Sequence, residues 1–340
     1  MASERSLEVL RVIVQDYVAS SVPVGSKSIV ERHAFGVSAA TIRSDMALLE
    51  EEELITAPHT SSGRIPTDKG YRVFVDQMAD LRPLSAAQRH AIETFLGNSS
   101  DLDEVLSRTV RLLSQLTQQV ALVQYPSLVR SRIRHIEVVS LSAHRVMAVL
   151  ITDSGRIEQR VVETPEVPEE LQLARVRSTL NALLGGMELS DASARLATIT
   201  DAFSEDDRAL AQVLSESLIE QVGANRTDRL VMAGAANLAR TEHDFSGSIF
   251  PVLEAIEEQV ALLRLFGEME PGQYGMSVRI GRENEAFGLG ETSVVAAGYT
   301  ASGGGAARLG VLGPTRMDYS SNMAAIKAVA RYLTKHLDDI

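Results

Sequence analysis

The chain has 340 residues, 45% of them hydrophobic and 23% charged, which suits two or three globular domains with real cores. It contains no cysteine, which excludes disulfides, cysteine nucleophiles and thiolate metal sites. It also lacks a membrane-spanning apolar run and a signal-peptide pattern, so we expect a cytoplasmic protein. The formal net charge of −12 argues against loose, non-specific binding to nucleic acid.

The first fifty residues predict three short helices. Apolar residues at three- and four-residue spacing indicate an amphipathic helix over 5–20. A turn follows, and Ser26 is a suitable N-cap for a second helix. After a glycine-containing break, Ser38 caps a third helix that runs to about Glu53. Two short helices joined by a tight turn are typical of a helix-turn-helix.

A β-hairpin is predicted directly after the third helix. Residues 54–67 have two apolar edges around a polar tip, Ser61-Ser62-Gly63, and this hairpin would be the wing of a winged helix. Thr67 then caps a fourth helix that continues to Met78, and Pro83 marks a linker.

The rest of the chain alternates between strand-like and helical segments. The expected helices cover 85–97, 101–120, 169–185, 189–203 and 205–221, and a final amphipathic helix contains Met323 to Leu333. The expected strands cover 136–141, 145–152, 157–163, 275–282, 292–300 and 309–312. This order of elements, in which a helical block separates two groups of strands and a helix closes the chain, predicts an α+β fold. One domain of this fold is interrupted by an insertion.

The third helix and the wing carry the predicted DNA-binding residues. A helix that begins at Ser38 would place its first side chains in the major groove, where Arg43 can reach a guanine while Thr41 and the helix N-terminus meet phosphate. Arg64 and the small residues of the wing tip would follow the backbone or the minor groove. The full predicted set is Ser26, Lys27, Ser38, Ala39, Ala40, Thr41, Arg43, Ser44, His59, Thr60, Ser61, Ser62 and Arg64. The alternative is a winged helix that binds protein.

Local charge bears on this prediction. Residues 1–80 hold eight Lys or Arg against twelve Asp or Glu, a net charge of −4. Four of the acids, Glu50–Glu53, lie at the far end of the third helix and can point away from phosphate. Residues 55–67 contain Arg64 and no acid. Binding should therefore depend on specific contacts and shape more than on bulk counterion release.

Signs of catalysis are weak. The seven histidines are scattered without metal-ligand spacing. There is no Walker loop, no Gly-x-Ser-x-Gly elbow and no complete dinucleotide fingerprint, and Gly288–Gly290 and Gly303–Gly305 are better explained by turns. We predict no enzyme activity, no cofactor and no metal. An enzyme on the α+β scaffold stays a third hypothesis, which paired carboxylates or histidines in a pocket would favour.

Four segments resemble a known family. Val24–Lys27, Ser38–Met46, Pro58–Arg72 and Gly310–Tyr319 are similar to the HrcA family of heat-inducible transcription repressors, with motifs near both ends of the chain in the family's order. In one place this sequence departs from the family: Glu53-Leu54 stands where a glycine-containing pair is usual. A glycine there would adopt a left-handed conformation at low cost. A glutamate in the same conformation would destabilise the protein by about 1 kcal/mol, or the helix would end in another way.

The resemblance implies three domains and two partners. It implies a homodimer that binds the inverted-repeat CIRCE operator of double-stranded DNA upstream of chaperone operons, and a GroEL-type chaperonin that keeps the repressor active. The implied fold is a winged helix-turn-helix followed by a GAF-like α+β domain, which is interrupted by an inserted dimerising domain. The predicted boundaries are 1–82 for the winged helix, 83–164 and 266–340 for the two parts of the GAF-like domain, and 165–265 for the insert.

We therefore predict a dimeric, operator-binding repressor of heat-shock genes. The alternative is a winged-helix regulator in which a small molecule bound in the GAF-like domain controls the release of DNA. A pocket lined with convergent polar groups would favour this alternative.

Overall fold

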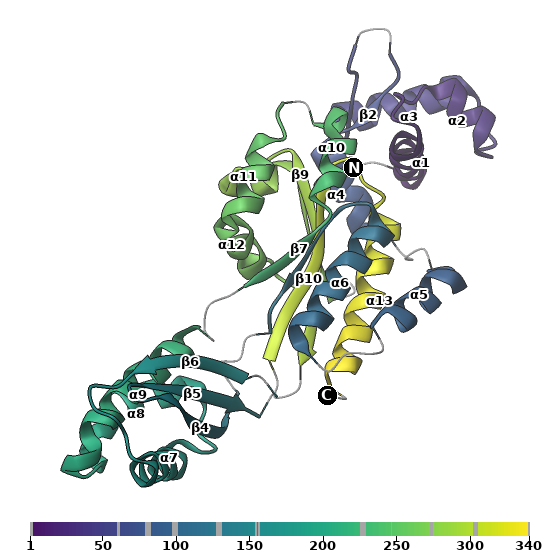
Figure 1. Ribbon diagram of the computed structural model, residues 1–340. Coiled ribbons are helices and arrows are strands. Elements are labelled where there is room, and N and C mark those ends of the chain that lie inside the picture. Colours follow the sequence, from purple (N-terminus) through teal and green to yellow (C-terminus); the bar gives the residue numbers. More distant parts are fainter. Residues whose placement is uncertain are drawn as a thin grey trace.

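The protein has an α+β fold whose parts are arranged around three β-sheets (Figure 1). The computed structural model describes residues 3–59, 62–78, 83–96, 101–126, 131–153, 155, 157–224, 229–245, 247–272, 275–301 and 305–338. We call the described residues of 3–78 the head, those of 131–224 the lobe, and those of 83–126 and 229–338 the body. The N-terminus lies by the head and the C-terminus at the far end of the body.

The head consists of four helices and a short hairpin. The helices are α1 (Glu4–Ser20), α2 (Ser26–Arg32), α3 (Ala39–Glu51) and α4 (Asp68–Asp76), and strands β1 (Ile55–Thr56) and β2 (Ile65–Pro66) form the hairpin. Two predicted caps are confirmed: Ser38 accepts from the amide of Thr41, and Thr67 accepts from the amide of Gly70. The expected cap at Ser26 is wrong, because Gly25 occupies the N-cap position and Ser26 is the first helical residue.

The end of α3 has the strain expected from its sequence. Glu53 has a φ of 59°, which is the left-handed conformation that glycine adopts most easily. The amide of Leu54 donates to the carbonyl of Leu49 at 2.8 Å, and this bond closes the helix before β1 begins. The glutamate therefore adopts the conformation of a glycine at a cost of about 1 kcal/mol.

A five-stranded sheet forms the centre of the body. Its strand order is β7-β3-β10-β9-β8, and every neighbouring pair is antiparallel. The strands are β3 (Val120–Gln124), β7 (Leu230–Ala233), β8 (Met276–Ile280), β9 (Thr292–Ala301) and β10 (Gly305–Pro314). Helices α6 (Leu102–Thr117) and α13 (Tyr319–Asp338) cover one face, with α5 (Ala86–Leu96) beside them, and α10 (Ala235–Arg240), α11 (Phe250–Glu258) and α12 (Val260–Glu268) lie on the other side (Figure 1).

The predicted helix over 101–120 is too long. Helix α6 ends at Thr117, Gln118 adopts a left-handed conformation, and β3 follows as an inner strand of the sheet. Residues 120–123 are all apolar and all buried, because the sheet is covered on both faces. A short run of apolar residues has no alternation of polar and apolar positions. In the sequence it therefore cannot be distinguished from a continuation of the apolar face of the preceding helix.

The lobe has its own sheet and its own core. Strands β4 (Ile133–Ser142), β5 (Arg145–Thr152) and β6 (Ile157–Glu163) pair in this order, and helices α7 (Glu170–Leu184) and α9 (Glu205–Ala224) pack on one face, with α8 (Leu189–Leu196) beside α9. Its core cluster runs from Ile133 to Val222. The expected boundary between 164 and 165 therefore crosses a single core, while α11 and α12, which were expected in the insert, pack on the sheet of the body.

None of the helices in the described ranges is both long enough and apolar enough to cross a membrane.

Candidate nucleic-acid interface

Helix α3 presents one polar face to solvent and holds the other in the core. Ile42, Met46 and Leu49 are buried, as their spacing predicted. Ala40, Arg43, Ser44 and Ala47 are exposed, and Ala39 is half-buried. Arg43 has no hydrogen-bond or ion-pair partner within the described residues. The exposed face thus combines one unpaired cation with small side chains, and Leu48 is 49% exposed toward the end of the helix. The small side chains allow a close approach to the edges of base pairs.

The N-terminus of α3 offers two backbone donors. The Ser38 hydroxyl accepts from the Thr41 amide at 3.2 Å and lies 3.0 Å from the Thr41 hydroxyl, so both side chains serve the cap. The amides of Ala39 and Ala40 have no acceptor in the part of the chain that the structure describes. Free amides at a helix N-terminus favour an anion such as phosphate.

A buried carboxylate, Asp45, holds the inner face of α3 against α1. It is 3% exposed and accepts from Arg5 Nε at 2.8 Å, from Arg5 Nη2 at 3.2 Å and from the Ser6 hydroxyl at 3.2 Å. This hydrogen bonding raises the pKa of Arg5 above its ordinary value. Asp45 is not among the residues predicted from the sequence, although its place between Ile42 and Met46, in the buried stripe of the helix, is a signal that indicates a buried carboxylate.

The wing is fastened to α3 by its arginine. Arg64 Nε donates to Glu50 Oε2 at 3.0 Å, and its Nη2 lies 2.9 Å from the same oxygen. Arg64 also exchanges two backbone hydrogen bonds with Val24, at 2.8 and 2.9 Å. A Cβ at Gly63 would lie 2.6 Å from the backbone of Pro23 and Val24, so this close approach requires glycine. Arg64 is thus paired within the head, and its contact with the DNA backbone stays a prediction.

The other predicted contact residues differ in how exposed they are. Lys27 and His59 are exposed. The Ser62 hydroxyl donates to the carbonyl of His59 at 2.6 Å and accepts from its amide at 2.9 Å, which closes the base of the wing tip. Ser26 is only 8% exposed, so its side chain does not belong to the surface. Thr60 and Ser61 lie outside the described residues.

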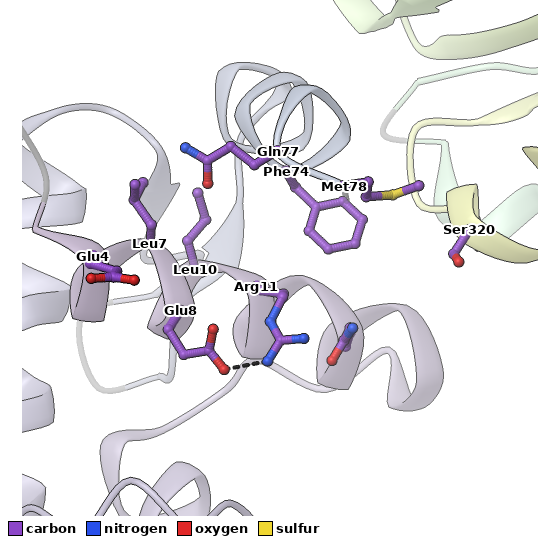
Figure 2. A pocket seen from close by; sticks show the side chains of 10 residues that line it. Glu4, Leu7, Glu8, Leu10, Arg11, Phe74, Gln77, Met78 and Ser320 are labelled. Carbon is purple, nitrogen blue, oxygen red and sulfur yellow. Dashed lines mark hydrogen bonds and ion pairs between the residues drawn. The ribbon is translucent and has the colours of Figure 1, made fainter. Parts of the chain in front are cut away.

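A hollow of about 490 Å³ lies where α1 and α4 meet the start of α13. Figure 2 shows Phe74 on α4, Met78 just after this helix, and the ion pair between Glu8 and Arg11 on α1. Glu4 also lines it. Because Arg11 is paired and the other charged groups here are carboxylates, this hollow does not suit a phosphate.

The space between the body sheet and helices α11 and α12 is filled by side chains. Leu262, Leu265 and Phe266 are fully buried there against Val294 and Leu312. These large side chains pack this side of the sheet as a core.

The comparisons with known proteins define the class as heat-inducible transcription repressors. The protein of Clavibacter michiganensis subsp. michiganensis with that name is 68% identical over 339 residues, and that of Leifsonia xyli subsp. xyli is 65% identical over 339 residues; each alignment covers 100% of both chains. A sequence model described as the HrcA protein C terminal domain matches residues 103–323. The chain belongs to the HrcA family.

A solved structure has the same overall fold. It is described as the crystal structure of a hypothetical protein, is 24% identical, covers 100% of this chain and 99% of its own, and superposes with a TM-score of 0.66.

Proposed function

We propose that this repressor binds an inverted-repeat operator of chaperone genes as a homodimer, with the head as a winged helix-turn-helix. Helix α3 is then the recognition helix and the hairpin is the wing. The observation that carries the proposal is the exposed face of α3, where Arg43 is unpaired between small side chains while Asp45 and Glu50 hold the same helix to α1 and the wing. A fixed helix with one free arginine is suited to reading a base edge.

Arg43→Ala should cost about 1–3 kcal/mol of operator binding and relax specificity, because a bidentate contact to one guanine would be lost. Arg64→Ala should weaken binding to operator and scrambled DNA alike, since it loosens the wing through Glu50 and touches no base. Gel-shift titrations with both DNAs would measure the two effects. If wild-type protein bound both DNAs equally, the proposed sequence recognition would be wrong.

We further propose that the body is the GAF-like domain and the lobe its dimerising insert. The lobe leaves the body after β3 and returns before β7, where the Tyr125 amide donates to the Arg229 carbonyl at 2.9 Å and the Arg229 guanidinium lies 4.7 Å from the Tyr125 ring centroid. The outward face of the lobe sheet carries Val139, Met147 and Val161 in one register row. Val139 and Val161 are 39% and 46% exposed, which is typical of an apolar surface that a partner covers.

The proposed activation by a GroEL-type chaperonin is supported by the topology of the body. Strand β3 pairs with β7 and β10, which follow in sequence only after the whole lobe. Pairing across such long separations is slow, and it leaves apolar surface exposed meanwhile, which is the state that chaperonins bind. Marginal stability would then let heat deplete the active dimer.

Chaperonin with its nucleotide should raise the fraction of protein that binds operator severalfold after dilution from denaturant. Metabolite mixtures or metal ions alone should not, because the chain is gated by its folding state. Operator binding by the refolded protein is the measurement, and dilution without any addition is the control. Full recovery with a small molecule alone would support the ligand-sensing alternative.

A further inference from the structure

The head and the body share one buried core. One continuous core cluster contains Leu10 and Phe74 from the head together with Val295 and Ile326 from the body. At its centre the rings of Tyr71 on α4 and Tyr319 on α13 lie 5.7 Å apart, and the two residues are 3% and 1% exposed. The head is therefore packed onto the body and does not hang from a linker.

Helix α4 is tied to the body at two charged residues. Arg72 Nε donates to Glu283 Oε1 at 2.8 Å, and Arg72 Nη2 donates to the carbonyl of Val278 at 2.7 Å. One turn earlier, Asp68 Oδ2 accepts from the amide of Arg282 at 3.0 Å. Gly281 has a φ of 51°, and a Cβ there would lie 2.1 Å from this same carboxylate oxygen. The backbone of the body is therefore shaped around the side chain of Asp68.

A third tie reaches the other end of the head. Arg316, which precedes α13, donates from Nη1 to the carbonyl of Val18 on α1 at 2.8 Å. Asp244 holds the same guanidinium through bonds of 2.7 and 2.6 Å. The side chains of Arg316 and Asp244 are 16% and 5% exposed. Such a bidentate, partly buried pair has little freedom to reorient.

The separate ties on α1 and α4 define an orientation of the head as well as its position. The contact joins residues far apart in the sequence. Arg72 on α4 bonds Glu283, Arg316 bonds the carbonyl of Val18 on α1, and Tyr71 packs on Tyr319. None of these residues lies on the exposed face of α3, so they do not compete for DNA. The orientation of the head relative to the body therefore determines the orientation of helix α3.

We propose that this head–body contact, with Arg72 and Glu283 as positioning residues, sets the half-site spacing that the repressor accepts. The inference rests on the proposed function, namely a dimer that binds an inverted repeat. One added base pair rotates a half-site by about 35° and moves it by about 3.4 Å. A head fixed on its body cannot follow that rotation on both half-sites, whereas a head with a weakened tie on α4 can follow more of it.

The test is a series of inverted repeats whose central spacers differ by up to three base pairs. Wild-type protein should show one optimum and lose about tenfold or more in affinity two base pairs away from it. Arg72→Ala removes one tie and leaves those of Asp68 and Arg316, so it should broaden the optimum and reduce the loss two base pairs away by about threefold. Glu283→Gln should do the same, since it keeps the size of the side chain and removes its charge. Arg108→Ala, which breaks an exposed ion pair with Glu104 on α6, is the matched control and should keep the wild-type optimum.

The outcomes separate this inference from the proposed function. A broadened optimum in both variants, with melting temperatures that show a folded protein, would support the inference. An unchanged optimum, or an equal loss of affinity at every spacing, would overturn it and leave the proposed function intact. Failure of wild-type protein to bind any inverted repeat would contradict the proposed function, and the inference with it.

Discussion

Met147→Glu should convert the protein to a monomer and lower its operator affinity on the order of 100-fold or more. Met147 lies on the middle strand of the lobe sheet, between Val139 and Val161, on the face opposite α7 and α9. A carboxylate there would stay solvated in the monomer but would be buried without a partner in a dimer. The loss of affinity follows because two linked heads bind two half-sites together, whereas one head binds only one.

Leu171→Glu is the matched control for this prediction. Leu171 is 73% exposed on α7, on the helical side of the same lobe, so it receives the same charge in a similar setting. Light scattering should find Leu171→Glu dimeric and Met147→Glu monomeric. The reverse result would move the interface to the helices of the lobe. A dimer in both variants would move the interface out of the lobe.

Gly70→Ala should destabilise the protein by about 3 kcal/mol, although alanine usually stabilises a helix relative to glycine. A Cβ at Gly70 would lie 2.0 Å from the carbonyl oxygen of Leu54 and 3.0 Å from its carbon, and backbone atoms cannot move aside as a flexible side chain can. The same carbonyl accepts from the Thr67 amide at 3.1 Å, so the strain reaches the cap of α4. Because head and body share one core, the melting temperature of both should fall, by roughly 6–12 °C.

Gly267→Ala is the control for this second prediction. Gly267 also lies in a helix, α12, and a Cβ there would meet nothing within 4 Å. Its replacement should raise stability by up to about 1 kcal/mol. Calorimetry of both variants would measure the difference. A Gly70→Ala variant as stable as the wild type would show that the approach of α4 to Leu54 is not close.

Local signals in the sequence were sufficient for most of the secondary structure. A capping side chain acts on an amide three residues away, so Ser38 and Thr67 could be assigned without knowledge of the fold. Strands β5 and β6 have the predicted bounds, 145–152 and 157–163. The exposure of Arg43 and Ser44 also followed from helical periodicity alone, since Ile42 and Met46 occupy the opposite face.

The partners of these elements were decided by the tertiary structure. The alternation in β5 predicts one buried face, but it does not say that α7 and α9 cover this face or that the other is left open. The position of Arg64 in the wing was predicted from the sequence, whereas its pairing with Glu50 depends on how the hairpin folds back onto α3. The ties of Arg72 and Arg316 join segments more distant still. Periodicity and capping reflect interactions between residues a few positions apart in the sequence. Contacts between distant segments depend instead on the packing of the whole chain.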